Sequence, residues 1–91
     1  MIYISLLNDK EEAIDESRIE LLNDELEYAS SIYKVEPIIS MSIKTYSNLK
    51  EICKSYQIED YTSLYDYISL YKGYKIFTDN AIPYGHILIR W

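Results

Sequence analysis

Residues 17–33 carry the pattern that most restricts how this chain can fold. Apolar side chains recur there at spacings of three and four residues, along one side of an α-helix: Ile19, Leu22, Leu26, Ala29 and Tyr33. Carboxylates fall on the opposite side of the same helix: Glu16, Glu20, Asp24 and Glu27. The pattern predicts that the rest of the chain covers the apolar side and leaves the acidic side in water.

The ends of this helix are indicated by two local signals. Ser17 and Glu20 have the spacing of a capping box, in which each side chain bonds to a backbone N–H group of the other residue, so we expect the helix to begin at Ser17. Pro37 restricts the preceding residue to an extended conformation, so we expect the helix to end near Lys34.

The remaining elements follow from periodicity and turn residues. Strands are predicted over 2–7, 37–44, 74–78 and 84–91, with the last two paired as an antiparallel hairpin. Further helices are predicted over 47–57, capped by Ser47, and over 60–72, stopped by Gly73. The order β-α-β-α-α-β-β predicts a single α+β domain over residues 1–91. We expect a two-layer fold, with a four-stranded mixed sheet and three helices mainly on one face.

Charge is unevenly distributed along the chain. Residues 1–36 hold ten acidic and three basic residues, a net charge of −7, whereas residues 37–91 hold five acidic and six basic residues, a net charge of +1. The negative field of the N-terminal part repels nucleic-acid and membrane phosphates and attracts basic proteins. Direct nucleic-acid binding is therefore not expected, because phosphate neutralisation supplies much of that affinity.

Signals for a membrane span, a disulfide framework or an active site are missing. No apolar run approaches the ~20 residues that cross a bilayer. The single Cys53 excludes an internal disulfide and fits a reducing cytosol. The sequence contains no GxSxG, HExxH, P-loop or CxxC motif, and one Cys with one His does not make a zinc site. We therefore expect neither enzymatic activity nor a metal or cofactor.

An active site around His86 is the alternative to that expectation. Asp79 lies across the predicted hairpin from His86, and tyrosine hydroxyls are abundant, so a small catalytic or metabolite-binding site is conceivable. The favoured interpretation is structural. His86 is then a half-exposed strand residue, and Cys53, at an apolar helix position, is a small buried hydrophobe.

The acidic helix side is the first candidate binding surface. Successive turns of a helix place side chains ~5–6 Å apart, comparable to the spacing of successive phosphates along a nucleic-acid strand. We predict that Glu16, Glu20, Asp24 and Glu27 bind a basic protein surface. The alternative is a solvated helix face without a partner, which is the commoner use of such a charge run.

The tyrosines provide the second candidate surface. The chain holds eleven tyrosines against one Phe and one Trp. The predicted helix over 60–72 is apolar around more than half of its circumference, which indicates either deep burial or an interface. Tyr67 and Tyr71 are the residues predicted to be exposed anchors, although packing in the core explains this helix as well.

The overall profile resembles small acidic inhibitor proteins, such as phage anti-defence (anti-CRISPR-like) proteins and nucleic-acid mimics. This resemblance is one of composition and covers mainly residues 9–36. It implies a cytoplasmic inhibitor, acting in the host cytoplasm if it is phage-encoded, that docks its acidic helix on a nucleic-acid-handling protein. The alternative is a homodimer or larger homo-oligomer with a structural or regulatory role, assembled through the helix over 60–72 or the C-terminal strand.

Overall fold

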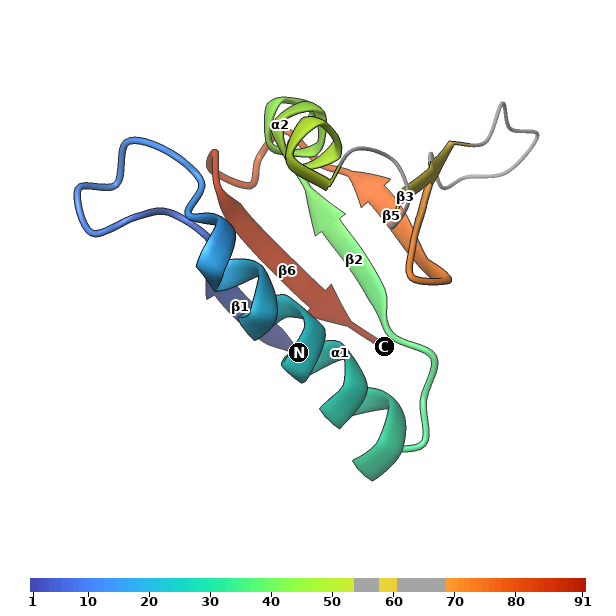
Figure 1. Ribbon diagram of the computed structural model, residues 1–91. Coiled ribbons are helices and arrows are strands. Elements are labelled where there is room, and N and C mark those ends of the chain that lie inside the picture. The colour runs from blue at the N-terminus through green and yellow to red at the C-terminus, as the bar shows by residue number, and fades with distance from the viewer. Residues whose placement is uncertain (54–57, 61–68) are drawn as a thin grey trace.

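The computed structural model describes residues 1–53, 58–60 and 69–91, with the backbone alone for 58–60 (Figure 1). The elements in chain order are β1 (Ile2–Ser5), a 3₁₀ helix η1 (Glu16–Arg18), α1 (Ile19–Ile32), β2 (Ile38–Met41), α2 (Ile43–Cys53), β3 (Ile58–Asp60), β4 (Ser69–Tyr71), β5 (Tyr74–Thr78) and β6 (His86–Arg90). The strands among these residues form one six-stranded sheet with the order β1-β6-β2-β5-β4-β3. The sheet is mixed, because β2 and β5 run parallel while the other neighbours run antiparallel.

The predicted hairpin between residues 74–78 and 84–91 is wrong, because β2 lies between these two strands. Ile39 of β2 is aligned with Ile76 of β5 on one side and with Ile89 of β6 on the other. All three of these isoleucines are fully buried. Both strands are present, but the apolar strand β2 lies between them and prevents their pairing.

The α+β class is confirmed, whereas four strands with three helices is wrong. The two ends of the predicted helix over 60–72 are strands: Asp60 belongs to β3, and Ser69–Tyr71 form β4. Lys72 and Gly73 both have positive φ, at 49° and 86°, and form the two-residue turn that joins β4 to β5. Such a turn matches the right-handed twist of paired strands, so Gly73 reverses the chain rather than ending a helix. The middle of the predicted helix, 61–68, lies outside the described residues.

Helix α1 agrees with the prediction, but its start differs. Ser17 does not cap α1: it lies in η1, and the residue before α1, Arg18, makes no side-chain capping bond. Asp15 caps η1 instead, because its Oδ1 accepts hydrogen bonds from the Ser17 backbone N–H (3.0 Å) and from the Ser17 hydroxyl (2.7 Å). The intervening η1 turn places this carboxylate beside unsatisfied N–H groups, where a negative charge is favourable. These hydrogen bonds lower the pKa of Asp15.

Helix α2 begins at Ile43, earlier than the predicted start near Ser47. The Ser42 hydroxyl accepts a hydrogen bond from the Thr45 backbone N–H (3.2 Å), so Ser42 caps the helix. Ser47 lies inside the helix, and its hydroxyl donates to the Ile43 carbonyl (3.0 Å). Residues 43 and 44, predicted as the end of a strand, therefore form the first turn of α2. The predicted end of this helix near Gln57 lies outside the described residues.

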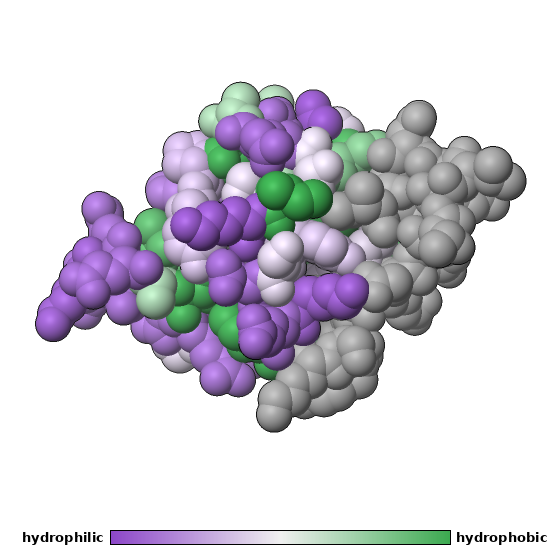
Figure 2. Space-filling view, turned by 90° about the horizontal axis from the view of Figure 1, so that it is seen from above, coloured by the Kyte–Doolittle hydropathy of each residue, from purple (hydrophilic) through white to green (hydrophobic). Residues whose placement is uncertain are grey.

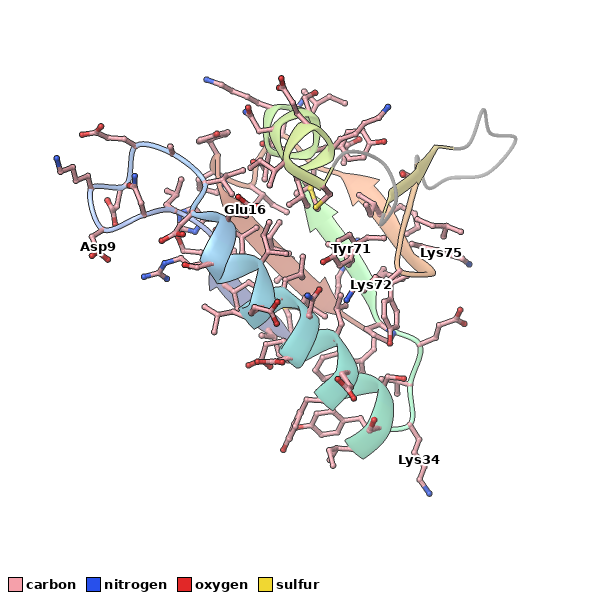
Figure 3. All side chains as sticks on the ribbon, viewed as in Figure 1. Asp9, Glu16, Lys34, Tyr71, Lys72 and Lys75 are labelled. Carbon is pink, nitrogen blue, oxygen red and sulfur yellow. The ribbon has the colours of Figure 1, made fainter. Side chains whose placement is uncertain are left out.

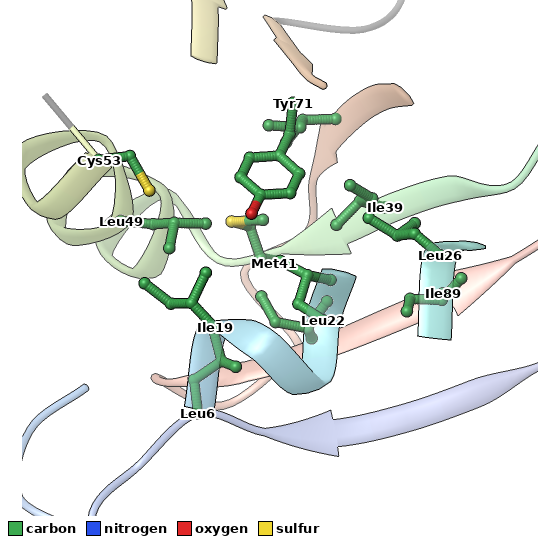
Figure 4. Packing of buried hydrophobic residues seen from close by; sticks show 12 residues of the cluster. Leu6, Ile19, Leu22, Leu26, Ile39, Met41, Leu49, Cys53, Tyr71 and Ile89 are labelled. Atoms are coloured by element: carbon green, nitrogen blue, oxygen red, sulfur yellow. The ribbon is translucent and has the colours of Figure 1, made fainter. Parts of the chain in front are cut away.

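The helices and the sheet share one core (Figure 4). The inner sides of α1 and α2 and the inward strand residues meet there: Leu6, Ile19, Leu22, Leu26, Ile39, Met41, Leu49, Cys53, Tyr71, Ile76, Ile87 and Ile89. In Figure 1, α1 runs in front of β1 and beside β6 on the near side of the sheet, and α2 lies above the end of β2. The side of α1 that faces away from the sheet is consequently left open to solvent.

Candidate protein-binding surface on helix α1

The outer side of α1 carries an acidic stripe, defined as Glu16, Glu20, Asp24 and Glu27. All four residues are exposed, as the sequence predicts. Glu16 lies in η1, at the start of the stripe (Figure 3). The other three residues follow on successive turns of α1. The structure thus brings the four predicted carboxylates together along one edge of the molecule.

Within the described part of the chain, no basic side chain forms an ion pair with the acidic stripe. Arg18, the nearest base in the sequence, is directed elsewhere: its guanidinium lies 3.8 Å from the Asp9 carboxylate and donates to the Ser5 carbonyl at 3.5 Å. Asp9 belongs to the loop 8–13, whose hydrophilic residues project at one end of the molecule in Figure 2. The negative charge of the stripe is therefore left for solvent or for a partner.

A second stripe on the outer side of α1 is apolar and was not predicted from the sequence. Leu21, Tyr28 and Ile32 are seven and four residues apart and have exposed fractions of 45%, 52% and 59%. We call these three residues the apolar stripe. A second apolar set at helical spacing was the available signal, and the inner, more regular set obscured it. Large apolar side chains gathered on one exposed helix side are typical of binding surfaces.

Aromatic contacts hold the C-terminal end of the apolar stripe in place. The ring of Tyr33 packs edge-on against Tyr28, with centroids 5.9 Å apart, and stacks on Trp91, with centroids 5.1 Å apart. Tyr33 was predicted to lie on the buried side of the helix, but half of its surface is exposed. Trp91 follows β6, so this stack connects the end of α1 to the sheet. The Tyr28 ring is thereby positioned before any partner arrives.

Two shallow depressions flank the acidic stripe. One, of about 270 Å³, is lined by Asp24, Glu27, Tyr28, Ser31 and Ile32, and thus lies where the acidic and apolar stripes meet. The other, of about 250 Å³, separates α1 from the turn between β4 and β5 and is lined by Asn23, Leu26, Glu27, Lys72 and Tyr74. Figure 3 shows Lys72 on this second side, facing α1. Among the described residues, the lining of the first depression has carboxylates and no cation.

Tyr71, one of the two tyrosines predicted as exposed anchors, does not contribute to this surface. Tyr71 is fully buried in the core beneath α1, and its hydroxyl donates a hydrogen bond to the Asn23 side chain. Burial is the main cause that raises the pKa of Tyr71 to about 12, and the charges of Cys53 and Glu20 add to it. Tyr67 lies outside the described residues. The sequence pattern did not distinguish a buried strand tyrosine from an exposed helix tyrosine.

The contacts of Asp79, His86 and Cys53, the residues considered for an active site or a reactive thiol, are those of residues that stabilise the fold. The Asp79 carboxylate accepts a hydrogen bond from the Ala81 backbone N–H (2.9 Å) in the turn after β5. The His86 ring lies 5.4 Å from the ring of Tyr3, centroid to centroid, on the outer face of the sheet. Cys53 is buried as predicted, and burial raises the pKa of its thiol, which disfavours the reactive thiolate.

In residues 1–53, 58–60 and 69–91, no three His, Cys, Asp or Glu side chains are grouped so that they could share a metal ion. None of the helices in that same part of the chain combines the length and the apolar character needed to cross a membrane. Comparison of the chain with protein-family models, with curated proteins and with solved structures gave no match.

Proposed function

We propose that this protein is an acidic binding inhibitor that docks the outer side of α1 on a basic, nucleic-acid-handling protein in the cytoplasm. The acidic stripe, which has no ion-pair partner among the residues that the structure describes, lies beside the exposed apolar stripe and carries this proposal. The carboxylates accelerate encounter with a basic surface, and burial of the apolar side chains then slows release. Occupation of a groove that otherwise binds phosphates would prevent the partner from binding nucleic acid.

A partner of opposite charge fits this surface better than a second copy of the chain. Two copies that met through their apolar stripes would bring their acidic stripes, which share the same helix, close together, and like charges at an interface are costly. Assembly through the edge of the C-terminal strand also meets an obstacle, because β6 is already paired with β1 and β2 on its two edges. We therefore rank the homo-oligomer below the inhibitor.

The test uses a charge-reversed variant and a control of equal net charge. Glu20→Lys, Asp24→Lys and Glu27→Lys reverse the acidic stripe, whereas the control reverses three exposed acids elsewhere: Glu12, Glu36 and Glu51. Each protein is immobilised and exposed to bacterial lysate at low and at high salt, and the retained proteins are identified by mass spectrometry. Circular dichroism establishes that both variants are folded.

We expect the wild type and the control to retain a nucleic-acid-binding protein at low salt, to release it at high salt, and to block its binding of DNA or RNA after purification. Screening shortens the reach of exposed charges to about 3 Å at 1 M salt, which explains the release. The stripe variant should retain none of it. Equal capture by the stripe variant, or a captured protein whose nucleic-acid binding is unaffected, would refute the proposal.

A further inference from the structure

The depression lined by Asp24, Glu27, Tyr28, Ser31 and Ile32 has the size of a site for one side chain. Its volume of about 270 Å³ falls below the roughly 300–1,000 Å³ of pockets that enclose a small molecule. These lining residues all come from consecutive turns of α1, so the depression is a feature of one rigid element. A chain segment that crosses α1 could insert a single long side chain here.

The lining has two chemically different walls. Tyr28 and Ile32 offer exposed apolar surface on one side. Asp24 and Glu27 offer carboxylates on the other, and within the described residues neither of them has a cationic partner. Such a site suits a side chain with an apolar stem and a cationic head, since the stem packs on the apolar wall while the head reaches the carboxylates.

Arginine matches these walls better than lysine does. The planar guanidinium donates through a fixed fork to carboxylate oxygens, and its flat face stacks on an aromatic ring. The Tyr28 ring packs edge-on against Tyr33, and Tyr33 is itself stacked on Trp91, so these contacts restrict the position of the Tyr28 ring. A ring positioned in advance loses little freedom when it is covered, so its contact contributes more to affinity.

We propose that this depression receives an arginine side chain of the partner protein. The inference rests on the proposed function, because it specifies how the basic partner is recognised. The guanidinium lies between the Asp24 and Glu27 carboxylates, its stem lies on Ile32, and Tyr28 covers one face. The Ser31 hydroxyl accepts a further N–H group.

The test is a titration of the ¹⁵N-labelled protein with three small probes, followed by amide chemical shifts. The probes are the N-acetyl amides of arginine, of lysine, and of citrulline, which has the shape of arginine without its charge. We expect arginine to shift the amides of residues 24, 27, 28, 31 and 32. Citrulline should bind about tenfold more weakly or worse, as the loss of a hydrogen bond to a charged group predicts, and lysine should bind more weakly than arginine.

Variants separate the two walls of the site. Tyr28→Leu keeps apolar surface but removes the ring, so it should abolish the preference for arginine over lysine. The control, Tyr3→Leu, changes another exposed tyrosine, on β1, and should leave that preference unchanged. Asp24→Asn with Glu27→Gln should abolish binding. Equal shifts with arginine and lysine, spread evenly over Glu12, Glu36 and Glu51, would overturn the inference, as would the absence of any shift.

The outcome is separable from that of the proposed function. Capture of a partner that depends on the acidic stripe, together with no arginine binding, would retain the inhibitor and reject the arginine site. If arginine binds, but the charge-reversed variant captures the partner as well as the wild type does, the arginine site is retained and electrostatic docking through the acidic stripe is rejected.

Discussion

The inner and outer sides of helix α1 are both rich in apolar residues, yet the fold uses only one of them. On the inner side Leu22, Leu26 and Ala29 have at most 1% of their surface exposed. On the outer side Leu21, Tyr28 and Ile32 retain about half of theirs. A helix that only had to cover a sheet would carry polar residues on its outer side. Folding therefore explains the inner side but not the outer side, for which we propose a role in binding.

Two adjacent leucines provide the most severe test of this comparison. Leu22→Ala removes a fully buried side chain from the core, so we expect it to lower the free energy of unfolding by about 2–5 kcal/mol. Leu21→Ala makes the same chemical change on the outer side and should cost less than about 0.5 kcal/mol. Urea denaturation measures both values. A similar loss for the two variants would mean that the outer side also stabilises the fold.

Tyr71 tests the polar contact between the inner side of α1 and the sheet. Tyr71→Phe removes the hydrogen bond from its hydroxyl to Asn23 while keeping the buried ring, so we expect a loss of about 0.5–1.5 kcal/mol. The control, Tyr28→Phe, removes a hydroxyl from a half-exposed ring and should leave stability unchanged. Urea denaturation of both variants checks this, and equal effects would contradict it.

The same tyrosine makes stability sensitive to alkaline pH. Burial raises the pKa of Tyr71 to about 12, whereas an unfolded tyrosine titrates near ~10. Because the folded state holds this proton more tightly, its contribution to stability is complete below pH ~10 and is lost as the pH rises through about 12. Denaturation midpoints measured across this range should fall more steeply for the wild type than for Tyr71→Phe. Parallel curves would show that the Tyr71 phenol does not couple to folding.

The sequence predicted the N-terminal part of the fold well, because one strong periodic helix dominates it. Spacing predicted the inner residues of α1, apart from Tyr33, and the exposure of the acidic stripe. The strand β1 was predicted from its β-branched and aromatic residues and from the turn residues that follow it. The helix starts were less accurate, since several polar residues near each start were able to cap. Ser42 caps α2 in place of Ser47, and Asp15 caps the turn η1 that precedes α1 in place of Ser17.

The described ends of the predicted helix over 60–72, which are Asp60 in β3 and residues 69–72 in β4 and its turn, were predicted wrongly for a physical reason. Tyrosine, leucine and isoleucine suit a buried strand as well as a helix, and a short run offers too few residues to separate the two periods. The turn at Lys72 and Gly73 lacks the Asn-Gly or Asp-Gly pair that marks a two-residue hairpin. The local sequence pattern also does not determine the order of strands in the sheet, because the position of β2 between β5 and β6 depends on contacts between residues distant in sequence.

Asp24 is expected to show the smallest effect, and one of opposite sign. It lies four residues after Glu20 and three before Glu27, so its carboxylate is repelled by two like charges on the helix surface. Asp24→Asn removes both repulsions. At about 0.2–0.5 kcal/mol per pair, the variant should be more stable than the wild type by about 0.4–1 kcal/mol at low salt, and the gain should fade as salt is added. Glu36→Gln, an exposed acid outside both helices, is the control and should give no such gain. If Asp24→Asn also weakens partner binding, the acidic stripe lowers the stability of the fold while it supports binding, as expected of a surface selected for function. A loss of stability in Asp24→Asn would instead show that this carboxylate serves the fold, and the two sides of α1 would no longer differ in kind.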